Sequence, residues 1–207
     1  MLISTSRIFK SIHSAVRNTR TLSKMTEFNI PAEDLQKNLE DVKTRIQQCE
    51  SSLEVPEGTI RLVAVSKTKP ASYIQALYDV GHRHFGENYF QELVEKSAEL
   101  PNDICWHFIG HLQSQKAKQM SQKIPNLYLL ETVDTIKLAD KLNNARSSME
   151  GLPPLQIYIQ INTSGEESKS GIPFNGNISP LFEHIKDSCP HLHIKGLMTI
   201  GETGNAE

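Results

Sequence analysis

Short apolar segments alternate with amphipathic segments along most of the chain, and this alternation constrains the fold more than any other feature. Strands are predicted at residues 60–66, 83–86, 104–109, 127–131, 155–162 and 193–198. Helices are predicted between them at 70–80, 89–100, 114–124, 135–149 and 179–187, and one more precedes the first strand at 34–49. Strands separated by helices pair in parallel through crossovers, so the pattern predicts either a (β/α) barrel or an open doubly wound sheet.

Polar residues at the strand ends favour the barrel. Six of them lie at or just past a predicted carboxyl end: Lys67, Asn88, His111, Glu131, Asn162 and Thr199. Barrel enzymes build their active sites from the loops at that face. No Gly-x-Gly-x-x-Gly follows a first strand, so a dinucleotide-binding sheet has no positive support. We therefore expect an α/β fold of the (β/α)8 type with about six of its βα units present.

Lys67 is the first candidate for chemistry. The apolar run 62–65 leads through Ser66 into Lys67, and Pro70 is placed to start the next helix. Apolar surroundings disfavour the charged form of a lysine, and the free amine can then form a Schiff base with an aldehyde. The alternative is a surface lysine just past a strand. Lys69 ranks lower because Pro70 interrupts the extended segment.

Five motifs carry a resemblance to a known family. They are AVSKTKP at 64–70, RHFGENY at 83–89, WHFIGHLQS at 106–114, QINTSGEESKSG at 160–171 and KGLMTIG at 195–201. In this order they resemble the pyridoxal 5'-phosphate (PLP) homeostasis proteins, which have the barrel fold of the alanine racemase N-terminal domain. The resemblance runs from about residue 35 to 201 and implies that Lys67 carries PLP as an imine. We therefore expect a carrier that buffers this aldehyde and passes it to PLP-dependent apoenzymes, and we expect it to be a monomer.

Three further residues are assigned to the cofactor site. Asn88 could bind the PLP ring or orient Lys67, and the alternative is an Asx turn or a helix cap. His107 alternates with two aromatic residues and would face the barrel interior, unless it is a core histidine with its own partner. Met198 could pack on the ring, although methionine is more often core filler.

Other functions stay open at this point. A PLP-dependent amino acid racemase needs acid/base groups on both faces of the cofactor, and alanine racemases take one from a second domain for which this chain has no room. A Schiff-base aldolase would use Lys67 without a cofactor. The family also has two further strands, whose phosphate-binding loops are not found after Gly201. We therefore expect a truncated form, which could have lost tight PLP binding, and a carrier without turnover.

Composition limits the partners and the compartment. Residues 1–26 contain five Lys and Arg and no Asp or Glu, which is typical of a mitochondrial transit peptide, and a disordered leader is the alternative. Initiation at Met25 would give a cytoplasmic form. The single PLP-binding domain is then expected over 31–207. The chain beyond residue 26 has 17 basic and 24 acidic residues, and this acidic balance argues against nucleic acid. No apolar run predicts a membrane span, and neither the three dispersed cysteines nor the histidines have a convincing metal-ligand spacing.

Overall fold

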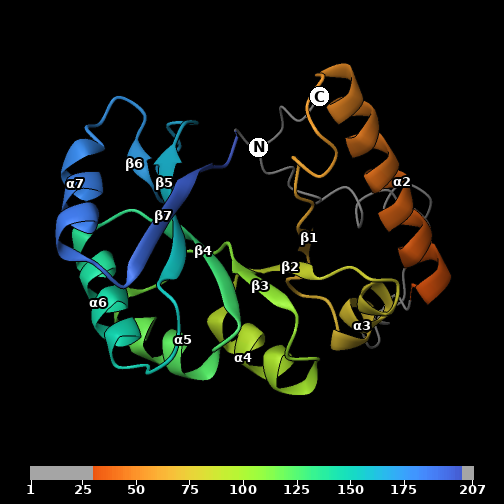
Figure 1. Ribbon diagram of the computed structural model, residues 1–207, viewed down its shortest axis with the longest axis horizontal. Coiled ribbons are helices and arrows are strands. Elements are labelled where there is room, and N and C mark those ends of the chain that lie inside the picture. The colour runs from red at the N-terminus through yellow and green to blue at the C-terminus, as the bar shows by residue number, and fades with distance from the viewer. Residues whose placement is uncertain (1–29, 202–207) are drawn as a thin grey trace, which may run out of the picture. The chain divides into compact units, whose positions relative to one another are not determined.

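The computed structural model describes residues 30–201 (Figure 1). The chain forms two compact units, and the boundary between them in the sequence falls between His84 and Phe85. The leader predicted at 1–26 lies outside the described residues, so its targeting role stays a prediction, as does the single domain over 31–207. No helix within residues 30–201 is both long enough and apolar enough to cross a membrane.

The first unit contains α2 (Ala32–Ser52), β1 (Ala64–Val65) and α3 (Ala71–Asp79). Helix α2 buries Leu35, Leu39 and Ile46, which share one face at helical spacing. Its last turn carries Glu50, whose carboxylate accepts hydrogen bonds from the backbone N–H of Gly58 (3.1 Å) and Ile60 (2.6 Å). The buried Glu50 side chain therefore fixes the loop that leads from the helix into the strand.

The predicted first strand is too long. Residues 60–66 were expected to be extended and paired, but the strand comprises only Ala64–Val65. At the start of the predicted segment, the N–H of Ile60 donates to the Glu50 carboxylate, so this residue belongs to the loop after α2 and not to the strand.

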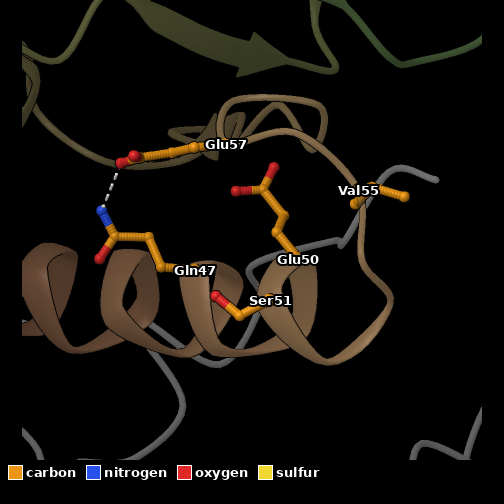
Figure 2. Close-up of a pocket in the computed structure, with 5 residues that line it drawn as sticks. All are labelled: Gln47, Glu50, Ser51, Val55 and Glu57. Carbon is orange, nitrogen blue, oxygen red and sulfur yellow. Dashed lines mark hydrogen bonds between the residues drawn. The ribbon is translucent and has the colours of Figure 1, made fainter.

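A cavity of about 310 Å³ lies beside this loop (Figure 2). It is lined by Gln47, Glu50, Ser51, Val55 and Glu57. Both of its carboxylates have protein partners, because Glu50 binds the loop backbone and Glu57 accepts a hydrogen bond of 3.0 Å from Gln47 Nε2. These groups support the loop, and we assign no ligand to the cavity.

The second unit is a parallel α/β sheet. Its elements are β2 (His84–Glu87), which starts at the boundary, α4 (Phe90–Glu99), β3 (Cys105–Phe108), η1 (Ser114–Lys116), α5 (Ala117–Lys123), β4 (Leu127–Val133), α6 (Ile136–Ser147), β5 (Leu155–Asn162), β6 (Ile172–Pro173), α7 (Ser179–Ser188) and β7 (Leu192–Thr199). The strands follow the order β2-β3-β4-β5-β6, and β7 also pairs with β5. Helices α4 to α7 follow one another along one side of these strands (Figure 1).

The predicted alternation of strands and helices is confirmed in this unit. The pairs β3/β4, β4/β5 and β5/β7 are all parallel, as crossover connections require. The apolar core between strands and helices includes the fully buried Phe85, Trp106 and Phe108, with the rings of Phe85 and Trp106 6.2 Å apart. The short strand β6 was not predicted, because a two-residue segment ending in proline has no readable period.

Candidate functional site

Lys67 lies in a tight turn directly after β1 in the first unit. The turn is closed by a hydrogen bond of 3.0 Å from Lys69 N–H to Ser66 O, so Lys67 is the first of its two central residues. Its side chain is exposed. Within residues 30–201, the structure does not place Lys67 in the apolar surroundings that we expected. The buried residues 62–64 precede the turn in which Lys67 lies.

The second central residue of this turn, Thr68, has a strained backbone. Its φ is +61°, in the left-handed region that β-branched residues rarely adopt. Such a conformation costs on the order of 1–3 kcal/mol, and strained residues cluster at functional sites. Thr68 is thus a feature that sequence reasoning missed, since the pattern around Pro70 predicted only the end of a strand.

Asn88, Gly110 and Thr132 join the carboxyl ends of β2, β3 and β4. Ile109 N–H donates to Glu87 O at 2.9 Å, and Thr132 Oγ1 donates to Gly110 O at 2.6 Å. Gly110 packs directly on the Asn88 backbone, since a Cβ at position 110 would lie 2.1 Å from Asn88 O. These contacts bring Asn88, Gly110 and Thr132 side by side at the carboxyl ends of the three strands.

The Asn88 side chain does not cap the following helix. Tyr89 is the N-cap of α4, and no side chain among the described residues bonds to this helix start. Asn88 Oδ1 is buried, yet no donor within residues 30–201 reaches it. A buried amide oxygen without a donor is costly, so this atom is available to a ligand.

Met198 lies beside a second buried amide. In the parallel pair of β5 and β7, Met198 is the register partner of Gln160, and both side chains are buried. Gln160 Nε2 donates to Ser170 O at 2.9 Å, whereas the described part of the chain offers no donor to Gln160 Oε1. Sequence reasoning missed Gln160, although a polar residue between Ile159 and Ile161 of a buried strand is the signal that could have found it.

His107 is paired with a carboxylate inside the protein. Its Nδ1 donates to Glu131 Oε1 at 2.6 Å, and each side chain is 1% exposed. The imidazole also lies 5.2 Å from the Tyr128 ring, centroid to centroid. His107 is therefore a core histidine with its own partner, which was one of the two possibilities considered from the sequence. A contact between His107 and PLP stays a prediction.

The loop between β5 and β6 is organised by Asn162. Its Nδ2 donates to Glu166 O at 3.0 Å and to Lys169 O at 3.1 Å, and its Oδ1 accepts from Gly165 N–H at 3.0 Å. The next contact ties the loop to the neighbouring strand end, because Gly171 N–H donates to Asp134 Oδ2 at 3.2 Å. These hydrogen bonds fix the conformation of the loop at this edge of the sheet.

A buried ion pair holds the segment that precedes Asn88. Lys96 Nζ of α4 lies 2.6 Å from Glu87 Oε1 and 2.6 Å from Glu92 Oε1. The Lys96 and Glu87 side chains are only 7% and 0% exposed, so both charges are desolvated. Since neither charge is solvated by water, each depends on its partner.

Replacing Lys96 by methionine should therefore lower the free energy of unfolding by about 3–5 kcal/mol, the cost of removing one partner of a buried pair. Methionine keeps most of the side-chain volume, so the loss of stability measures the effect of removing the charge. Urea denaturation would measure it, with the exposed Lys118→Met as the matched control, which should change stability by less than about 0.5 kcal/mol. Equal effects of the two changes would contradict the assigned pair.

Comparison with known proteins identifies the fold and the family. The sequence profile of the alanine racemase N-terminal domain matches residues 33–206, which confirms the predicted barrel-type α/β fold class. The human pyridoxal phosphate homeostasis protein is 47% identical over 174 residues, covering 81% of this chain and 62% of the human protein. Its counterpart from Schizosaccharomyces pombe is 43% identical over 169 residues, covering 82% of this chain and 67% of that protein.

A solved structure with its ligand is also similar. PipY of Synechococcus elongatus, determined with PLP bound, superposes with a TM-score of 0.60 at 29% identity, covering 80% of this chain and 73% of PipY. The chain belongs to the pyridoxal phosphate homeostasis protein family, as its motifs predicted. It spans about 62% of the length of the human relative.

Proposed function

We propose that this protein binds PLP as a Schiff base on Lys67 and serves PLP homeostasis in the cell, as a monomeric carrier that passes the cofactor to PLP-dependent apoenzymes. Membership in the family carries this proposal, together with the PLP-bound structure of PipY. The chemistry follows from the two groups involved. The Lys67 amine attacks the aldehyde carbon and one water leaves, and hydrolysis of the imine returns both partners.

The exposure of Lys67 suits a carrier. An amine in a turn at the surface can be reached by free PLP and by the water that later hydrolyses the imine. A homeostasis protein must release its cargo, so an enclosed lysine would be a disadvantage. The strained Thr68 beside it supports a functional role for this turn.

The second unit by itself has buried polar groups that can bind a ligand. Asn88 Oδ1 and Gln160 Oε1 are buried and receive no hydrogen bond within residues 30–201, so they can accept one from a ligand O–H or N–H group. Met198, the register partner of Gln160, offers a polarizable thioether to an aromatic ring. Asn88, Met198 and His107 are the residues of this unit that we assign to PLP binding.

Reductive trapping tests the proposal. PLP added to the purified protein should give the yellow absorbance of an imine, and borohydride should reduce it to a stable amine on Lys67, located by peptide mass spectrometry. Pyridoxine 5'-phosphate, which lacks the aldehyde, is the matched control and should give no adduct. Modification mainly of Lys69, or spread over exposed lysines such as Lys118, would overturn the assignment.

A further inference from the structure

Three metal-ligating side chains meet between α6 and α7, outside the candidate cofactor site. Asp140 comes from the middle of α6, His184 from α7, and Cys189 from the position directly after α7. Their ligand atoms all lie within 4.8 Å of one another. A sequence separation of 49 residues between Asp140 and Cys189 explains why no metal-ligand spacing was recognised in the sequence.

The distances within this cluster are close to those of a metal site. His184 Nε2 lies 2.6 Å from Asp140 Oδ1, and Cys189 Sγ lies 3.9 Å from the same oxygen. Around a tetrahedral zinc ion, neighbouring donor atoms are roughly 3.3–3.6 Å apart, given bond lengths of about 2.0–2.3 Å. Shifts of about 1 Å, within reach of side-chain rotations, would bring the three atoms to those separations.

We propose that Asp140, His184 and Cys189 bind a zinc ion. Thiolate, imidazole and carboxylate together are zinc ligands, whereas Mg²⁺ and Ca²⁺ prefer oxygen ligands alone. The Asp140 and His184 side chains are 47% and 28% exposed, so a water molecule can complete the tetrahedron. On binding, the thiol proton is released to solvent and no redox step is involved.

The consequence of zinc binding would be a link between two helices. Asn143, one turn beyond Asp140 on α6, already accepts a hydrogen bond of 2.9 Å from His191 N–H, just after Cys189. Zinc would add coordinate bonds between α6 and the segment that leads into β7. Cys189 precedes β7, whereas Asn88 and Met198 lie at the carboxyl ends of strands, so the zinc site and the PLP site are separate and this inference does not rest on the proposed function.

Cobalt titration tests the site directly. The full chain, stripped with a chelator and titrated with Co²⁺ alone, should show the near-ultraviolet charge-transfer band of a cobalt–thiolate bond, and Zn²⁺ should displace it. Cys189→Ser should abolish the band, while Cys49→Ser, which changes an exposed cysteine of α2, should retain it. Absence of the band from the unmodified chain, or its retention in Cys189→Ser, would overturn the proposal.

A second variant separates metal binding from folding. His184→Gln changes a partly exposed side chain and should leave the circular dichroism spectrum unchanged. It should lower the Zn²⁺ affinity by at least about 100-fold, since loss of a direct ligand exceeds the 10–100-fold cost of losing a supporting group. Zn²⁺ should raise the Tm of the unmodified chain and of His193→Gln, which changes an exposed histidine of β7, but not that of His184→Gln. Equal Zn²⁺ affinity in the two variants would contradict a ligand role for His184.

Discussion

The Lys67→Ala protein is expected to form no imine with PLP and to be colourless once unbound PLP has been removed. The reason is that the imine requires a primary amine, and in the proposed function this amine is Lys67 Nζ. Folding should be unaffected, because Lys67 is exposed and a surface change of this kind shifts stability by less than about 0.5 kcal/mol. Absorbance with added PLP and urea denaturation would measure the two expectations on the same sample.

Lys69→Ala is the matched control for this result. Lys69 closes the same turn through its backbone N–H, which alanine retains, so this variant should keep the turn and most of the absorbance. Loss of colour in both variants would point to the turn and not to the Lys67 amine. A yellow Lys67→Ala protein would show that another lysine holds the aldehyde.

Gly110→Ala should be among the most destabilising single changes in the second unit. The added Cβ would lie 2.1 Å from Asn88 O and 2.7 Å from Asn88 C, and both are backbone atoms that cannot rotate away. The ends of β2 and β3 would have to separate, which strains the adjacent hydrogen bond from Ile109 N–H to Glu87 O. We expect a loss of at least about 3 kcal/mol, the upper part of the range for overpacking.

Gly201→Ala provides the control, because no atom lies within 4 Å of a Cβ at that position. Its stability should change by less than about 0.5 kcal/mol. If the proposed function holds, Gly110→Ala should also weaken PLP binding, since it displaces Asn88. Equal unfolding midpoints for the two variants would contradict the close packing of Gly110 on Asn88.

Much of the fold could be predicted because it depends on local patterns. The helices near 70–80 and 89–100 lie within one or two residues of α3 and α4, since Pro70, Gly81 and Pro101 delimit them in the sequence. The first strand was predicted too long, because the apolar pattern does not show that Ile60 is bonded to the Glu50 carboxylate in the preceding loop. The fold class could be predicted because the five motifs together resemble one family. The chemistry of each motif alone would not have identified the fold.

The candidate site was less predictable than the fold. Lys67 was recognised from its position after an apolar run. Its exposure results from the turn that follows β1, and the apolar pattern does not reveal this turn. Gln160 was missed because its unused oxygen is a property of the packed sheet, and the cluster of Asp140, His184 and Cys189 because two helices bring it together. The sequence periodicity records which residues are buried, and it does not record which polar atoms remain without a partner.

The loop held by Asn162 has a thermodynamic consequence for any ligand of this edge of the sheet. Fixing the backbone of one flexible residue costs roughly 1–2 kcal/mol in conformational entropy. Here a single amide side chain, bonded to Gly165, Glu166 and Lys169, has already restricted the chain between β5 and β6. Ligand binding therefore does not include the entropic cost of ordering this segment, and a ligand that makes few contacts can be retained.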